Sequence, residues 1–362
     1  MYVTDSLKGV CMNIEKDLWT YLSETEKPIV MYGMGNGADK ILERFDELNI
    51  KVSDFFASDG FVRGHSFHGK TVLSFSEIKE KYDDFIIILS FASSLDNMLD
   101  WFYELNYKYE MYAPDVPVTG SGTFNLNFYN DNKHLFESAR QLLADEQSIK
   151  VFDNVIKYKL TGKIEYLKEI ETTPDEAWNN ILSPEKYLVC VDAGAYNGDT
   201  AKEMLSKCEN ISKIYALEPD KRNFKKLQTL SEQNEKVLPF NVAAWSEDTL
   251  LEFDETGNRN SNPFSLNSKK VTSIEAKTID NLCNMSADYI KYDVEGAERF
   301  ALLGSEKTIK SCSPDLLVST YHRNEDLFDL PLLINKLNPD YKLYLRKFKY
   351  VPAWDLNLYA VK

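Results

Sequence analysis

The sequence lacks the features that mark several common classes of protein. Its five cysteines are far apart and never form a CxxC pair, so neither a disulfide framework nor a cysteine zinc site is indicated. No apolar run reaches the roughly 18 residues of a transmembrane helix, and charges between Met1 and Leu22 argue against a signal peptide. We therefore expect a cytoplasmic protein with reduced thiols and no membrane span.

Positive charge is also scarce. The chain has 42 Lys and Arg against 57 Asp and Glu, a formal net charge of -15. Such a surface repels a phosphate backbone, and no basic stripe with interleaved aromatics compensates, so nucleic acid is not expected as a partner. Hydrophobic residues make up 43% of the 362 residues. This length and composition predict a globular chain of two domains with connecting helices.

The front of the chain, residues 27–117, alternates short apolar runs with amphipathic stretches, as parallel βαβ units do. A helix is expected over Ala38–Leu48, where apolar residues recur at helical spacing. The strands expected around it are Ile29–Tyr32, Val52–Ala57 and Phe85–Leu89. The pattern predicts a smaller Rossmann-like domain over residues 1–118.

The middle of the chain, residues 119–184, is expected to be a helical connector. Apolar residues recur on a helical period between Leu135 and Leu160, and Gly162, Pro174 and Pro184 interrupt the pattern. Such segments mostly serve packing. Shaping a substrate pocket or forming a homodimer contact are the alternatives, and no chemistry is assigned to it.

From Tyr187 the βα rhythm restarts and predicts a second α/β domain over residues 185–362. Helices are expected from Thr200 and over Arg222–Glu232, and the polar stretch Asn258–Asn262 is expected to be a loop. The expected strands are Tyr187–Asp192, Lys213–Leu217, Val237–Asn241, Tyr289–Tyr292, Leu316–Thr320, Tyr341–Phe348 and Asn357–Val361. The last two follow a parallel series closely, which predicts an antiparallel C-terminal hairpin at the edge of the sheet.

The strongest motif is a glycine-rich turn after the strand that ends at Asp192. Its spacing is DxGxxxG, from Asp192 through Gly194 to Gly198, whereas a dinucleotide site favours GxGxxG. Glu218 ends the next strand, where a carboxylate can accept both ribose hydroxyls. Small residues after the third strand leave room for adenine. The set expected at an adenosine cofactor is Asp192, Gly194, Tyr196, Gly198, Asp199, Thr200, Glu218, Pro219, Asn241, Ala243 and Ala244.

A second group of polar residues follows the later strands. Asp293, Glu295 and Glu298 lie within six residues after one strand, and His322 follows the next. Acids at the carboxyl end of parallel strands face the cofactor cleft, where they orient a hydroxyl, act as a base or bind a metal. We expect His322 as base, with Asp293 and Glu295 beside it. A helix cap for Asp293, a solvated helix acid for Glu298 and a structural role for His322 are the alternatives. A divalent metal is conceivable but not predicted, because no tight ligand motif is present.

Together these residues resemble the FkbM family of methyltransferases. The matching segments are Asp192–Thr200, Ala216–Asp220, Thr278–Leu282, Tyr289–Glu298, Ser319–Asp326 and Tyr341–Arg346. The resemblance covers about residues 185–362 and implies a class I methyltransferase sheet, S-adenosylmethionine as cofactor and O-methyl transfer to a sugar, glycan or related small metabolite. It implies that Asp192, Gly194, Gly198 and Glu218 bind the cofactor, with Asp293, Glu295 and His322 at the reacting end.

The front domain resembles nucleotide-sugar-binding domains. Gly33, Gly35 and Gly37 form a GxGxxA turn after a strand, and Asp59 follows the next strand at a spacing suited to a ribose. A degenerate domain used for docking or dimerisation is an equal alternative. Two other functions also stay open: a nucleotide-dependent oxidoreductase that uses this turn, and a catalytically silent protein that binds a nucleotide sugar.

Overall fold

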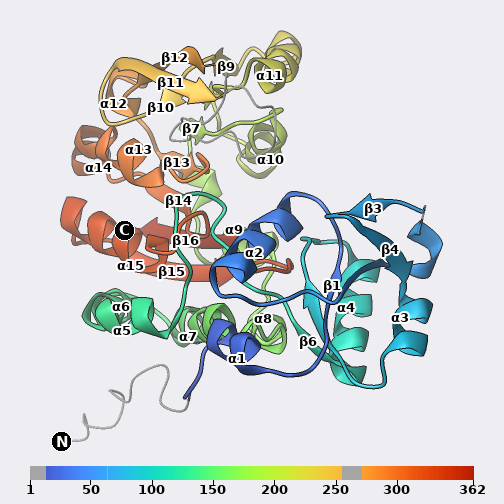
Figure 1. The fold of residues 1–362 in the computed structure, drawn as a ribbon. Helices are drawn as coiled ribbons and strands as arrows, with labels where there is room; N and C mark the ends of the chain where they lie inside the picture. Colours follow the sequence, from blue (N-terminus) through green and yellow to red (C-terminus); the bar gives the residue numbers. More distant parts are fainter. Residues whose placement is uncertain (1–13, 63, 255–270) are drawn as a thin grey trace, which may run out of the picture.

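The computed structural model describes residues 14–62, 64–254 and 271–362, and Figure 1 shows two α/β sheets joined by helices. The loop expected at Asn258–Asn262 lies outside the described residues. Within the part that is described, no helix is long and apolar enough to cross a membrane.

The front sheet has six strands in the order β3-β4-β2-β1-β5-β6, parallel except for the β3–β4 pair. Both faces of β1 and β5 are buried, which explains their uninterrupted apolar sequences. The strands are β1 (Ile29–Tyr32), β2 (Asp54–Ala57), β3 (Ser66–Phe67), β4 (Lys70–Ser74), β5 (Ile86–Leu89) and β6 (Glu110–Tyr112). The helices are α1 (Leu18–Glu24), α2 (Asn36–Glu47), α3 (Phe75–Lys81) and α4 (Asp96–Lys108).

The middle segment is helical, as expected. Its helices are α5 (Leu126–Asp131), α6 (Lys133–Gln141), α7 (Glu146–Thr161), α8 (Glu165–Lys168) and α9 (Pro174–Asn180). Asp145 caps α7 by accepting from the N–H of Ser148, and Gly162 ends it in the left-handed conformation. The buried Arg346 donates to Asp145 at 2.7 Å and to Glu176 at 2.9 Å, which ties the ends of α7 and α9 to the second sheet.

The second sheet has seven strands in the order β15-β16-β14-β13-β7-β8-β9. The expected hairpin is confirmed, because β16 is antiparallel to both β14 and β15 while the other pairs are parallel. The strands are β7 (Val189–Ala193), β8 (Lys213–Leu217), β9 (Val237–Phe240), β13 (Tyr289–Tyr292), β14 (Asp315–Ser319), β15 (Lys342–Lys347) and β16 (Leu356–Val361). Ala193 pairs with Leu217 and Tyr292, so β7, β8 and β13 end at one edge of the sheet.

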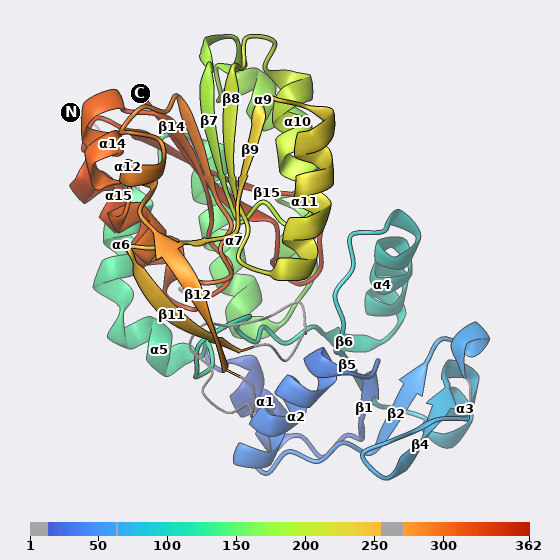
Figure 2. The same cartoon turned by 90° about the horizontal axis from the view of Figure 1, so that it is seen from above.

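The helices of this half connect the parallel strands. They are α10 (Asp199–Lys207), α11 (Lys221–Gln233), α12 (Ile279–Leu282), α13 (Glu298–Leu303), α14 (Glu306–Cys312) and α15 (Asp326–Leu337). A three-stranded ribbon, which the sequence reasoning missed, lies apart from β7, β8 and β9 in Figure 2. Its strands are β10 (Ala243–Ala244), β11 (Thr249–Asp254) and β12 (Val271–Lys277).

One hydrophobic core extends across both sheets and the helices between them. It includes Val30 of the front sheet, Val155 of α7 and Val191 of the second sheet. The antiparallel Ser93–Val351 bridge adds backbone hydrogen bonds of 2.9 and 3.0 Å between the two halves. The front sheet is therefore packed onto the rest of the chain.

Candidate active site

The turn between β7 and α10 needs glycine because the chain packs closely around it. Gly194 has φ +85°, and a Cβ there would lie 1.8 Å from the carbonyl oxygen of Asp293. Gly198 has φ +86°, and a Cβ there would lie 2.5 Å from the side chain of Leu230. The sequence reasoning attributed both glycines to the approach of a ligand. The contacts show that packing within the protein already requires them.

Asp192, at the end of β7, is completely buried and lies 3.4 Å from the Nζ atom of Lys291 on β13. Among the described residues, neither of its carboxylate oxygens has a hydrogen-bond partner, and burial raises the pKa of this carboxyl. Lys291 also donates to the carbonyl oxygen of Gly194 at 3.2 Å. Burial opposes the charge on Lys291, but Asp192 and Asp293 outweigh it, so its pKa lies above the ordinary value.

Lys291 was not among the residues expected at the site. A single lysine within the apolar strand Tyr289–Tyr292 was the available signal, because a lysine on a strand buried throughout needs a charged partner. The structure supplies that partner in Asp192.

Glu218, at the end of β8, is held in place by backbone groups. Its two carboxylate oxygens accept from the N–H of Tyr196 at 2.7 Å and from the N–H of Asp220 at 2.8 Å. The side chain is 6% exposed, and burial raises its pKa to about 7. A carboxylate oxygen can accept more than one hydrogen bond, so this group still suits ribose hydroxyls.

The other residues expected at the cofactor surround these two acids. Tyr196 has φ +47° and a half-exposed side chain, and Pro219 follows Glu218 directly. Asp199 and Thr200 begin α10, and Ala243 and Ala244 form β10. The Asn241 amide donates to the carbonyl oxygens of Glu218 at 2.8 Å and Pro219 at 3.1 Å, which ties the ends of β8 and β9 together.

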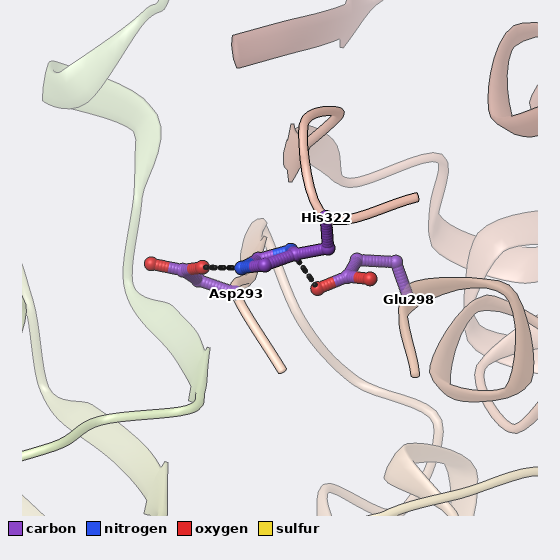
Figure 3. Close-up of side chains that lie close together, drawn as sticks. All are labelled: Asp293, Glu298 and His322. Atoms are coloured by element: carbon purple, nitrogen blue, oxygen red, sulfur yellow. Dashed lines mark ion pairs between the residues drawn. The ribbon is translucent and has the colours of Figure 1, made fainter. Parts of the chain in front are cut away.

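The second group of expected residues gathers around His322. Its Nε2 atom lies 3.6 Å from Asp293 and 3.6 Å from Glu295, and its Nδ1 atom lies 3.0 Å from Glu298. Figure 3 shows the imidazole ring standing between Asp293 and Glu298. Ligand atoms of these three residues come within 4.8 Å of one another, as a metal site requires. Both ring nitrogens face acids, so His322 is in ion-pair contact with three carboxylates.

The acids around His322 set its charge. Burial opposes protonation, but Glu298, Asp293 and Glu295 outweigh it and raise the pKa of His322 to about 10. Burial also opposes the charge on Asp293, but Lys291 and His322 hold its pKa below the ordinary value. Burial raises the pKa of Glu295 to about 7. At neutral pH the group therefore contains an imidazolium beside an ionised Asp293.

The glycine turn of the front domain is also packed against its own chain. A Cβ on Gly37 would lie 2.3 Å from the carbonyl oxygen of Ser90, and one on Gly33 would lie 2.5 Å from Phe91. A Cβ on Gly35 would have no atom of the described residues within 4 Å. The Asp59 carboxylate accepts from the backbone N–H and the hydroxyl of Ser76. These contacts explain the glycines at 33 and 37 and the acid at 59 without a ligand.

A cavity of 190 Å³ lies beyond the carboxyl ends of β1 and β5, beside this turn. Loop residues between β15 and β16 close it from the other half of the chain. The described residues that line it are mostly apolar and all uncharged: Met34, Gly37, Ile41, Leu89, Ser90, Phe91, Ala92, Ala113, Pro114, Val116, Val351, Pro352 and Trp354. Such a lining suits an uncharged group better than a phosphate.

Residues 192–351 match the Methyltransferase FkbM domain family. The crystal structure of methyltransferase FkbM from Methylobacillus flagellatus KT has a similar fold, with a TM-score of 0.72 and 21% sequence identity over 92% of this chain and 90% of that chain. Aeropyrum pernix fibrillarin in complex with natively bound S-adenosyl-L-methionine is much less similar, with a TM-score of 0.32 and 12% identity over 50% of this chain and 69% of that chain. No curated protein matches the sequence.

Proposed function

We propose that this chain, an S-adenosylmethionine-dependent methyltransferase whose residues 192–351 form a domain of the FkbM family, methylates a hydroxyl oxygen of a sugar, glycan or related small metabolite. The proposal that the methyl acceptor is an oxygen rests on one observation: Asp293, beside His322, is ionised and partly exposed. A hydroxyl must lose its proton as it is methylated, and a carboxylate in the cleft can take that proton.

The cofactor end of the proposed site is formed by Asp192, Glu218 and the turn that joins β7 to α10. Bound S-adenosylmethionine supplies the electrophilic methyl group. The fixed Glu218 carboxylate would accept hydrogen bonds from the ribose hydroxyls. Within the part of the chain that the structure describes, both carboxylate oxygens of the buried Asp192 lack a hydrogen bond. Most of the acceleration should come from alignment of the acceptor with the methyl carbon, which this rigid turn favours.

At the acceptor end we propose that Asp293 takes the hydroxyl proton. His322 was expected to be the base from its place in the sequence. A histidine with a pKa of about 10 is protonated at neutral pH, which favours a different assignment, with the imidazolium positioning Asp293 and Glu295. The two assignments predict different pH dependence, because a His322 base would keep gaining activity up to about pH 10.

A labelled-methyl assay on glycan and lipid extracts tests the proposal. We expect transfer by the native chain and a loss of about 10²- to 10⁴-fold in Asp293→Asn, the usual contribution of a general base. Asp340→Asn, an exposed acid in the same half, is the control. Equal activity of Asp293→Asn and the native chain would contradict the role of Asp293. The proton transfer to Asp293 is proposed without a metal ion, so a chelator should not change the activity. Loss of activity on addition of a chelator would contradict that part of the proposal.

The other functions considered from the sequence have less support. An oxidoreductase would use the front glycine turn for a pyrophosphate, but the described residues that line the cavity beside this turn are all uncharged. We propose instead that the front domain takes part in acceptor binding through its uncharged cavity. The division at residues 118 and 184, a cytoplasmic location and a homodimer stay predictions.

A further inference from the structure

We propose that Glu298 is a positioning residue that holds the His322 ring by its Nδ1 atom, so that Nε2 faces Asp293 and Glu295 on the acceptor side. This role is distinct from the proton transfer proposed for Asp293. Glu298 was considered above as a solvated acid on a helix, but its side chain is 1% exposed.

The backbone fixes the Glu298 carboxylate. Its Oε1 atom accepts from the N–H of Val294 at 2.9 Å and from the N–H of Gly296 at 3.3 Å, and the same oxygen lies 3.0 Å from His322 Nδ1. Glu298 therefore connects the turn after β13 to the histidine after β14. An anchored acid behind an imidazole fixes the orientation of the ring and stabilises its protonated form, as in the Ser-His-Asp arrangement.

His322 is held from other sides as well. Its carbonyl oxygen accepts from the N–H of Thr119 at 3.0 Å, and the ring of Tyr321 lies with its centroid 4.2 Å away. Arg323 donates to the carbonyl oxygen of Gly296 at 2.8 Å. The titratable groups that act on the ring come from the turn after β13, from α13, from the segment after β14 and from α15: Asp293, Glu295, Glu298, Tyr321 and Asp326.

Glu298 is the acid of this group that lies closest to a ring nitrogen and is least exposed. Asp293 and Glu295 lie 3.6 Å from the opposite nitrogen, with side chains 32% and 46% exposed, so solvent screens them more. Removal of the charge on Glu298 should therefore reduce the proton affinity of His322 more than removal of either partly exposed acid.

NMR titration of histidine ring signals tests this directly. The chain has only four histidines, and His322→Gln identifies the signal of interest. In the native chain we expect His322 to stay protonated well above the pH at which exposed histidines titrate. In Glu298→Gln, which retains an acceptor for the backbone N–H groups, its midpoint should fall by about 1 to 3 pH units, the effect of one close opposite charge.

Glu306→Gln, which removes a partly exposed acid paired with Lys310 on α14, is the matched control and should leave the midpoint unchanged. An unchanged midpoint in a folded Glu298→Gln protein would overturn the proposal. If that variant does not fold, the native titration decides, because a His322 midpoint near 6.5 would also overturn it. The inference rests on the proposed function only where it links the position of the His322 ring to methyl transfer. The titration needs no methyl transfer, so failure of either proposal is recognised separately.

Discussion

At the scale of single residues, the charge on Glu218 should control cofactor affinity. Burial raises its pKa to about 7, so the protonated form becomes dominant as the pH falls below that value. A protonated carboxyl has lost part of its capacity to accept hydrogen bonds from ribose hydroxyls. We expect the Kd for S-adenosylmethionine, measured by calorimetry, to be roughly tenfold higher at pH 6 than at pH 8.

Glu218→Gln provides the control for this prediction, because an amide does not titrate. Its Kd should be higher than that of the native chain at pH 8 and should lack this pH dependence. A native Kd that stays constant from pH 6 to pH 8 would show that Glu218 is ionised throughout or does not contact the cofactor.

The sequence could predict residues whose role follows from their place at the end of a strand. Asp192, Glu218 and Asp293 were selected on that basis, and the structure places all three at one edge of the sheet. Lys291 was not selected, because it lies inside a strand and not at its end, and the hydrophobic pattern of a strand does not indicate a functional role for one lysine within it. Glu298 could not be recognised, because an acid in the first turn of a helix is usually solvated and its burial depends on tertiary packing.

At the scale of structural elements, the turn after β7 depends on close packing against β13. Gly194→Ala would place a Cβ 1.8 Å from the carbonyl oxygen of Asp293 and force a positive φ on alanine. The backbone cost alone is about 1–2 kcal/mol, and the clash adds to it. We expect a clear fall in the free energy of unfolding, measured by urea denaturation, together with weaker S-adenosylmethionine binding.

Gly122→Ala is a control for the backbone term. Gly122 has the same φ as Gly194, +85°, but a Cβ there would meet no described atom within 4 Å. The difference between the two variants therefore reports the clash with Asp293. Equal losses of stability would mean that β7 and β13 can separate at this point without cost.

Elements were predictable where their sequences were apolar and clearly bounded. Ile29–Tyr32, Lys213–Leu217 and Tyr289–Tyr292 were predicted with the bounds that the structure has. The strand β3 was missed because it has only two residues, and β4 because only one of its five residues is buried, which weakens the hydrophobic alternation. The β11–β12 pair was missed because the polar stretch beside it suggested a loop.

At the scale of the whole molecule, two α/β sheets share one core but differ at their carboxyl edges. The second sheet presents buried acids at the ends of β7 and β8, whereas the front sheet presents an apolar cavity beyond β1 and β5. Sequence periodicity predicted two such sheets. It could not distinguish these edges, because residues of the β15–β16 loop, far along the chain, help to form the front cavity.

The most direct test of the account is calorimetric titration of the whole chain with S-adenosylmethionine and, separately, with NADH. The cavity beside the front glycine turn is lined, within the described residues, by uncharged side chains, whereas Asp192 and Glu218 of the second sheet suit an adenosine cofactor. We therefore predict one binding site per chain for S-adenosylmethionine, greatly weakened in Glu218→Ala, and no binding of NADH. Binding of NADH without binding of S-adenosylmethionine would contradict the account.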